Sequence, residues 1–408
     1  MKSFTWMLGL CLLSCQPLPQ VEPAKPSHSA KPSAGQSIQP LATPSPQSSL
    51  PPPATPSSAA PSNLLSENGI TLRPLENLAE YWGVHLSAEE KAIYGSINPS
   101  CIDQKGNFYF PGKSGLYQFS SSQRQITQVI STKLNPSVLI DGPTNTAEFT
   151  GFHNCIVFPD QSIYFLDRSF LRKLQPDRSV VTLNKNNEAP RFSLRSMVYD
   201  ALNHRLIYSL FGNGLQAWDL QTEKSIMLHQ QYFSDLKRID GFVDGELGKD
   251  AQFGQDLVLD IDPRSSRLYV DDYDNRAIRM IENNRVTTLA GNSQKKFSHD
   301  GQGQEASFES PTDMQYDSTH DLILVLDRSR IRIVKTSGEV RTLNLPGQDR
   351  TGEMYFLNKF FSSIYKVVIV DKNHWVIFVT GPLEENGTTK GQVYAVTLPD
   401  ILPEIKIP

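Results

Sequence analysis

The chain has 408 residues, with 39 lysines and arginines against 43 aspartates and glutamates, and a formal net charge of −4 at pH 7. This near balance, without a basic stripe, creates no field that would attract nucleic acid, so no nucleic-acid partner is expected. The first 62 residues have a non-globular composition, and the remaining length suffices for one large domain or two modest ones.

Residues 1–14 are typical of a bacterial signal peptide. Lys2 supplies a positive charge, and the apolar run from Phe4 to Leu13 is too short to span a bilayer. The run ends in Leu-Leu-Ser before Cys15, which resembles the lipobox of bacterial lipoproteins. That resemblance implies cleavage before Cys15 and a lipid on its thiol, whereas the alternative is an ordinary secretory signal with an incidental cysteine. We therefore expect a lipid-anchored protein of the cell envelope, facing outside the cytoplasm at the outer membrane or cell surface, that touches the membrane through this lipid only.

Residues 15–62 are dominated by Pro, Ser, Ala, Gln and Thr and contain no aromatic residue. Such a stretch cannot bury enough apolar area to offset its ordering entropy. It is predicted to be a disordered tether that lets the following domain stand clear of the lipid headgroups.

Residues 63–96 are predicted to form a short N-terminal extension with helical character. Trp82 and other apolar residues precede Ser87, which has the spacing of a capping box with Glu90. One or two short helices are therefore expected. Ile70–Leu72 is expected to be a strand that pairs with the last unit of the domain that follows and helps to close it.

An internal repeat dominates residues 97–400. In each copy an Asp-Gly turn and an Ala-x-Phe sequence precede an apolar strand that ends in Asp, a tight turn, and a strand that contains Arg; a short alternating segment ends the unit. Four antiparallel strands of this kind make one blade of a propeller. The three best copies have their cores at Phe165–Leu174, Leu268–Ile281 and Val325–Val334.

These units resemble the NHL repeat, whose signature runs from a Gly-rich turn through Ala-x-Phe to a Leu-Tyr-x-x-Asp-x-x-Asn-x-x-Ile-Arg core and a Val-x-Thr-x-x-Gly close. Residues 240–291 fit it nearly throughout, and the units around Asp167 and Asp327 fit except that Asn is missing from the turn. Weaker units contain Cys101, Met197 and Val367. Six units imply an all-β, six-bladed NHL-type β-propeller over residues 97–400, followed by a C-terminal tail at residues 401–408 and no second domain.

The repeated aspartates Asp167, Asp272 and Asp327 are expected to be structural. A carboxylate that opens a tight turn most often accepts backbone N–H groups of that turn. Arg168 and Arg328 recur in two units, which suggests a repeated packing or ion-pair role rather than a unique catalytic site.

The resemblance places ligands at one mouth of the central channel, where the innermost strand of each blade begins. The residues there are polar, mixed in charge and different in each blade, which fits a mid-sized polar ligand or a peptide loop. A solvated rim without a ligand is the alternative. The candidate binding residues are Asn98, His153, Asn154, Arg195, Gln255, Asp256, Thr312, Asp313 and Lys366.

Two kinds of enzyme resemble this repeat fold. The peptidyl-amidating lyases hold zinc with three histidines, but only His153 lies at a suitable position. The gluconolactonase type holds calcium with Glu, Asn and Asp, and Asn154, Asp256 and Asp313 match part of that set, without a Glu. The sequence also lacks the Gly-x-Ser-x-Gly, phosphate-loop, His-Glu-x-x-His and Cys-x-x-Cys motifs. No catalytic residue, metal or cofactor is therefore predicted, although a calcium ion in the channel is compatible with the sequence.

The sequence thus favours a non-enzymatic binding or scaffold module for a protein, peptide or other ligand. A metal-dependent, lactonase-like hydrolase or lyase at the channel mouth and a structural envelope protein are the alternatives. After cleavage only Cys101 and Cys155 remain, and they form either one disulfide or two separately buried thiols.

Overall fold

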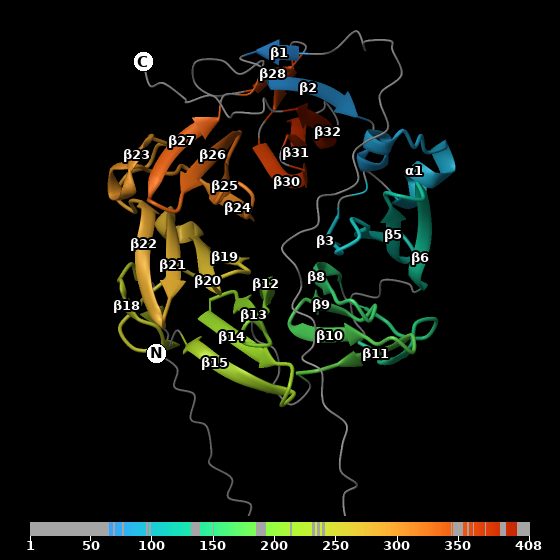
Figure 1. Ribbon diagram of the computed structural model, residues 1–408, viewed down its shortest axis with the longest axis horizontal. Coiled ribbons are helices and arrows are strands. Elements are labelled where there is room, and N and C mark those ends of the chain that lie inside the picture. The colour runs from blue at the N-terminus through green and yellow to red at the C-terminus, as the bar shows by residue number, and fades with distance from the viewer. Residues whose placement is uncertain are drawn as a thin grey trace, which may run out of the picture. The chain divides into compact units, whose positions relative to one another are not determined.

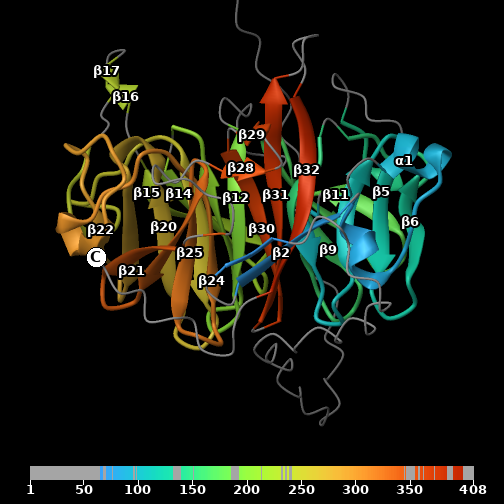
Figure 2. The same ribbon diagram turned by 90° about the horizontal axis from the view of Figure 1, so that it is seen from above.

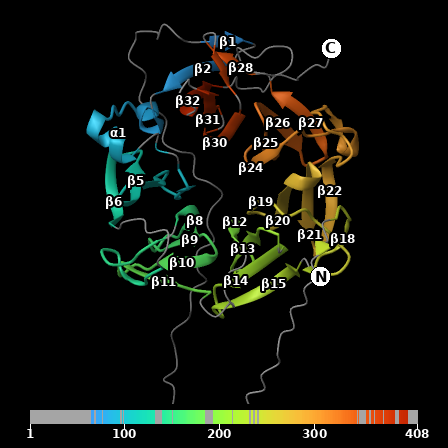
Figure 3. The same cartoon turned by 180° about the vertical axis from the view of Figure 1, so that it is seen from behind.

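Six antiparallel sheets stand in a ring in the computed structural model, so the chain folds as a six-bladed β-propeller (Figures 1 and 3). This confirms the predicted fold class. The structure describes residues 65–67, 70–75, 77–94, 97, 99–131, 139–149, 151–184, 193–212, 214–230, 233–234, 237–238, 241–343, 345, 354–356, 359–361, 363–371, 373–383 and 389–397.

Blades 1 to 3 follow one another along the chain, and each begins with its innermost strand. Blade 1 consists of β3 (Cys101–Ile102), β4 (Phe108–Gly112), β5 (Gly115–Ser120) and β6 (Gln125–Ser131). Blade 2 consists of β8 (His153–Val157), β9 (Ile163–Asp167), β10 (Phe170–Leu174) and β11 (Ser179–Thr182). Blade 3 consists of β12 (Leu194–Asp200), β13 (Arg205–Leu210), β14 (Gly214–Asp219) and β15 (Lys224–Gln230).

Blades 4 to 6 have the same order of strands from the centre outward. Blade 4 consists of β19 (Leu257–Asp262), β20 (Arg267–Asp272), β21 (Ala277–Glu282) and β22 (Arg285–Gly291). Blade 5 consists of β24 (Pro311–Asp317), β25 (Leu322–Asp327), β26 (Arg330–Lys335) and β27 (Glu339–Leu343). Blade 6 consists of β30 (Ser363–Asp371), β31 (His374–Leu383), β32 (Thr389–Thr397) and β2 (Ile70–Leu75).

A short fifth strand covers the outer edge of four blades. These strands are β7 (Gly142–Pro143) on blade 2, β18 (Gly245–Glu246) on blade 4, β23 (Gly301–Gln302) on blade 5 and β1 (Leu65–Glu67) on blade 6. Two short hairpins and two single-turn helices lie in the connections between these strands: β16 (Phe233–Ser234) with β17 (Lys237–Arg238), β28 (Met354–Phe356) with β29 (Lys359–Phe361), η2 (Tyr273–Asn275) and η3 (Gly303–Glu305).

The ring is closed by the N-terminal strand β2, which pairs with the strand β32 near the other end of the chain. Thr71 lies opposite Thr397 and Leu72 lies opposite Val396 in an antiparallel ladder. Ile70 and Leu72 alternate into the core and are 1% and 0% exposed, which fixes the register of the strand. The expected strand at Ile70–Leu72 is thus confirmed, and it supplies the fourth strand of blade 6.

Two short helices follow β2 and pack beside blade 1: η1 (Leu78–Trp82) and α1 (Ala88–Tyr94) (Figure 2). The expected capping box begins α1. The N–H of Glu90 donates to Ser87 Oγ at 3.2 Å, and the N–H of Ser87 donates to Glu90 Oε2 at 2.8 Å. None of the helices among these described residues is long and apolar enough to cross a membrane.

The apolar core lies between neighbouring blades rather than in one central mass. Each of the six clusters of buried residues draws on two consecutive blades; for example, Tyr269 and Ile278 of blade 4 pack with Ile323 and Val325 of blade 5. The strand β25 is buried along its whole length because both of its faces lie against other elements. The centre of the ring is therefore free for polar side chains.

A buried arginine holds each of blades 2, 4 and 5 together in the same way. Arg279 of blade 4 is fully buried and donates to Asp272 Oδ2 at 2.9 Å, to Asp244 Oδ1 at 2.7 Å, and to the carbonyl oxygens of Gln252 and Val243. Its guanidinium also stacks on the ring of Phe253. Arg172 in blade 2 and Arg332 in blade 5 make the equivalent contacts.

The structural role expected for Asp167, Asp272 and Asp327 is confirmed, but their backbone donors differ from the prediction. Each carboxylate accepts an N–H from the segment before the innermost strand, such as that of Gly254 for Asp272 at 2.8 Å, because the buried arginine draws this segment onto the blade. The repeated packing or ion-pair role inferred for Arg168 and Arg328 is confirmed only in part, because Arg328 forms an ion pair with Glu309, whereas Arg168 has no ion pair among the described residues. Both are exposed in left-handed turn positions, with φ of 53° and 59°, and the repeated arginine lies four residues further on.

Candidate functional site

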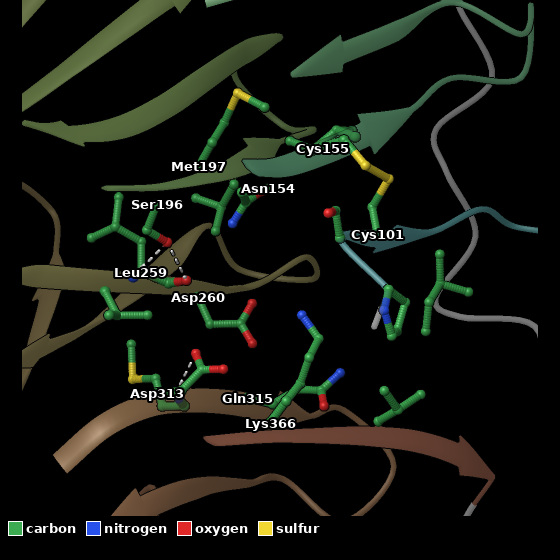
Figure 4. Close-up of a pocket in the computed structure, with 18 of the residues that line it drawn as sticks. Cys101, Asn154, Cys155, Ser196, Met197, Leu259, Asp260, Asp313, Gln315 and Lys366 are labelled. Carbon is green, nitrogen blue, oxygen red and sulfur yellow. Dashed lines mark hydrogen bonds between the residues drawn. A yellow bond between two sulfur atoms is a disulfide. The ribbon is translucent and has the colours of Figure 1, made fainter. Parts of the chain in front are cut away.

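The innermost strands of all six blades surround a cavity of about 1090 Å³ on the axis of the ring (Figure 4). Each strand buries alternate side chains between blades and presents others to the cavity. In β19, for example, Leu257 and Leu259 pack toward blade 3, whereas Asp260 reaches toward blade 5 and accepts the N–H of Tyr316. One polar residue from each blade illustrates the lining: Ser100, Asn154, Ser196, Asp260, Gln315 and Lys366.

The half of the cavity formed by blades 1 and 2 carries no charged side chain among the lining residues. Ile102, Phe152 and Ile156 contribute apolar surface, and Asn154 contributes an amide. A disulfide between Cys101 of β3 and Cys155 of β8 joins the two blades at the cavity wall, with their Cα atoms 5.2 Å apart (Figure 4). Of the two alternatives for these cysteines, the structure therefore has the disulfide.

The opposite half, formed by blades 4, 5 and 6, carries three charged side chains that point into the same part of the cavity: Asp260, Asp313 and Lys366 (Figure 4). Asp260 accepts the N–H of Ile261 at 2.8 Å and that of Tyr316 at 2.6 Å, and Asp313 accepts the N–H of Met314 at 3.0 Å. Within the described part of the chain, the Lys366 ammonium has neither a hydrogen bond nor an ion pair. The three groups thus share a space without neutralising one another.

Burial shifts the pKa of all three groups toward their neutral forms. It raises the pKa of Asp260 to about 7, against two N–H groups that favour the anion, and the neighbouring Asp313 adds to the rise. Burial also raises the pKa of Asp313, against the opposing effect of Lys366 and Arg195. It lowers the pKa of Lys366, although Asp313 acts in the other direction. Each charge is therefore only partly compensated by the protein.

The fourth charged residue of the lining, Arg195, is in a different situation. Its Nε donates to Asp256 Oδ1 at 2.8 Å, in an ion pair that connects blade 3 to blade 4. The guanidinium is half-exposed, so the pair contributes little stability, but it neutralises the charge of Arg195.

Five of the residues proposed from the sequence line the cavity: Asn154, Arg195, Thr312, Asp313 and Lys366. Asp256 reaches the site through its ion pair with Arg195, and Gln255 is buried beside it, with its backbone bonded to Asp274 and Gly212. His153 belongs to β8, but its side chain, like the whole of Asn98 and Cys15, lies outside the described residues.

Sequence reasoning missed Asp260 and Gln315, which lie deeper in the channel. It considered only the first residues of each inner strand, whereas the cavity continues along the strands. The signal was present, because a polar residue in an otherwise apolar inner strand needs a polar neighbour or a cavity. The Oε1 atom of Gln315 is buried and has no hydrogen-bond partner among the described residues.

A metal site was considered at Asn154, Asp256 and Asp313. No group of three or more His, Cys, Asp or Glu in the described ranges is arranged to hold a metal ion. The arrangement instead offers one amine, one guanidinium, two carboxyl groups and three amides facing a space large enough for a small organic molecule.

Comparison with known proteins finds similarity among solved structures only. No family model and no curated protein matches this sequence. Among solved structures, an auxiliary nutrient-binding protein from Bacteroides thetaiotaomicron aligns with a TM-score of 0.49 and 13% identity over 72% of this chain and 66% of its own. A second auxiliary nutrient-binding protein, from Bacteroides ovatus, gives 0.47 and 10% over 71% and 66%. A luciferin-regenerating enzyme gives 0.41 and 12% over 71% and 87%. This chain spans just under two thirds of the two nutrient-binding proteins.

Proposed function

We propose that the protein is a lipid-anchored, NHL-type propeller of the cell envelope that binds a polar ligand in its central cavity and acts there as a non-enzymatic binding module. The observation that carries the proposal is the convergence of unlike polar side chains from six blades on one cavity, with Asp260, Asp313 and Lys366 left without mutual ion pairs. A purely structural ring has no need for such groups, because partly desolvated charges without partners destabilise the fold.

The anchor is supported by the sequence of the N-terminus. An apolar run ends immediately before Cys15, and a Pro- and Ser-rich stretch separates this cysteine from the propeller. A Cys15→Ala variant should lose incorporation of labelled palmitate and appear in the soluble fraction of the envelope. Unchanged labelling of the variant would contradict the anchor without affecting the binding proposal.

The binding proposal is tested by saturation-transfer NMR on the full chain in detergent, with a defined library of short peptides, sugars, nucleosides and lactones. We expect at least one compound to bind. Its signal should disappear in Ser100→Trp, which fills the cavity, and persist in Ser122→Trp, which places the same ring on an exposed hairpin. The proposal would be refuted if no compound bound, or if every compound that bound did so equally well to Ser100→Trp. Turnover of a lactone would instead favour the hydrolase alternative.

A further inference from the structure

Lys366 differs from the buried arginines and from the other cation of the cavity in its lack of a carboxylate partner within the described part of the chain. The fully buried arginines Arg172, Arg279 and Arg332 each contact two carboxylates, and Arg195 pairs with Asp256. Lys366 is the exception, because it has no partner among the described residues although Asp260 and Asp313 face the same space. Opposite charges that share a cavity without meeting are suited to a molecule that lies between them.

We infer, on the basis of the proposed function, that the cavity binds a short peptide with free ends, with its ammonium group at Asp260 and Asp313 and its carboxylate at Lys366. The ligand then supplies the counter-charges that the protein omits. In a site of this kind an ammonium and a carboxylate gain both attraction and direct hydrogen bonds.

The partial desolvation of these groups supports the inference. Burial raises the pKa of both carboxyl groups and lowers the pKa of the lysine, so the surrounding protein disfavours their charged forms. A ligand with one positive and one negative end would stabilise the charged forms of the carboxyl groups and of the lysine at the same time. A neutral polyol would leave all three uncompensated, and a polyanion such as a nucleotide would meet Asp260 and Asp313.

The rest of the cavity fits the body of a peptide rather than a single amino acid. Its volume of about 1090 Å³ lies just above the roughly 300 to 1,000 Å³ usual for small-molecule sites. The uncharged half, with Ile102, Phe152, Ile156 and the disulfide, can accept aliphatic side chains. Asn154 and Gln315 can bond to peptide groups, and the buried Gln315 Oε1 lacks a partner among the described residues.

The test is isothermal titration of the full chain in detergent with three probes: Ala-Ala-Ala, its N-acetyl derivative and its C-terminal amide. Ala-Ala-Ala should bind, and blocking either end should lower its affinity at least about tenfold, since one buried charge then loses its partner. Because these comparisons use the unaltered protein, they do not depend on the folding of any variant.

Two substitutions test which residue binds each end of the peptide. Lys366→Met should remove the difference between Ala-Ala-Ala and its amide, and Asp313→Asn should reduce the difference between Ala-Ala-Ala and its acetylated form. Lys105→Met and Asp250→Asn, at exposed loop positions, are the matched controls and should preserve both differences.

Three results would overturn the inference. The first is no binding of Ala-Ala-Ala, the second is a change of less than about twofold on blocking either end, and the third is retained discrimination between Ala-Ala-Ala and its amide in Lys366→Met. If a sugar or nucleoside from the library binds in the cavity while the peptide does not, the inference fails and the proposed function stands. If no compound binds there, both fail.

Discussion

Asp271 and Asp272 are consecutive and both fully buried, yet only Asp272 has hydrogen-bond partners among the described residues. Asp272 accepts from Arg279, from Asn275 Nδ2 and from the N–H of Gly254. Asp271 points to the opposite face of β20, where it pairs across the sheet with Val258 of the cavity wall. Burial, with Asp272 next to it, raises the pKa of Asp271 well above its usual value.

We predict that Asp271→Leu stabilises the protein by about 1 to 3 kcal/mol at neutral pH. The equivalent residues of blades 2 and 5 are Leu166 and Leu326, so the site accepts leucine in this fold. The pKa of Asp271 is higher in the folded protein than the value of about 3.9 in the unfolded chain, so the folded state holds the proton of this residue more tightly. Below a pH of about 3.9 the carboxyl group is therefore neutral in both states and costs no stability through its charge, and this advantage is lost as the pH rises through the pKa of the folded protein. The gain in Asp271→Leu should therefore be small near pH 4 and larger near pH 7, as measured by urea unfolding.

The neighbouring substitution Asp272→Leu is the control and should have the opposite sign. It leaves Arg279 buried with one carboxylate fewer, which should cost about 3 to 5 kcal/mol. If Asp271→Leu also destabilises the protein, then its carboxyl group has a favourable partner in solution.

The buried arginines should matter far more than the exposed arginines of the same repeat. Arg279→Met removes the cation shared by Asp244 and Asp272 and should lower the free energy of unfolding by about 3 to 5 kcal/mol. Arg168→Ala alters an exposed turn residue and should change it by less than about 0.5 kcal/mol. Thermal and urea unfolding of both variants measure this difference. Equal effects would show that the shared network does not hold the blade together.

The disulfide should stabilise the ring by reducing the conformational entropy of the unfolded chain. Cys101 and Cys155 are 54 residues apart, and closing a loop of that length contributes about 4 kcal/mol in the chain-entropy description. Urea unfolding with and without a phosphine reductant should show this loss. The double variant Cys101→Ser with Cys155→Ser should resemble the reduced protein and be insensitive to the reductant; a reductant effect in that variant would contradict the prediction.

The propeller could be predicted from the sequence because the sequence pattern of one blade is repeated along the chain. Three clear copies of one unit specify the strand order of a blade, and the weaker copies then follow by spacing. The role of the repeated arginine was harder to see. Arg172 bonds to Asp141, 31 residues earlier, through a turn that only the folded blade brings close. Arg168 and Arg172 both recur in the sequence, and recurrence alone does not distinguish the exposed arginine from the buried one.

The site could be predicted only at the level of strand starts. Each blade contributes a different residue, so no repeat connects Asp260 to Lys366, and their shared cavity depends on the closed ring. The ion pair between Arg195 and Asp256 joins residues 61 apart in the chain and also depends on the order of the blades. Local patterns therefore indicate which residues face the axis, but not which of them neutralise each other.

The carboxyl group of Asp260 should titrate near neutrality. Its pKa is raised to about 7, chiefly by burial and also by Asp313, so carbon-13 NMR of the side-chain carboxyl should show a midpoint in that range, and Asp313→Asn should lower it. The other charged groups that face it are Lys366 and the Arg195–Asp256 pair. A ligand ammonium favours the ionised form of Asp260. The affinity for Ala-Ala-Ala should therefore rise as the pH increases from about 5.5 to 7.5, below the α-amino pKa of about 8. Titrations in buffers of different ionisation enthalpy should show a proton released on binding. An affinity that falls over this interval in Lys366→Met, in which no lysine proton can be lost, would mean that the ammonium group does not lie at Asp260.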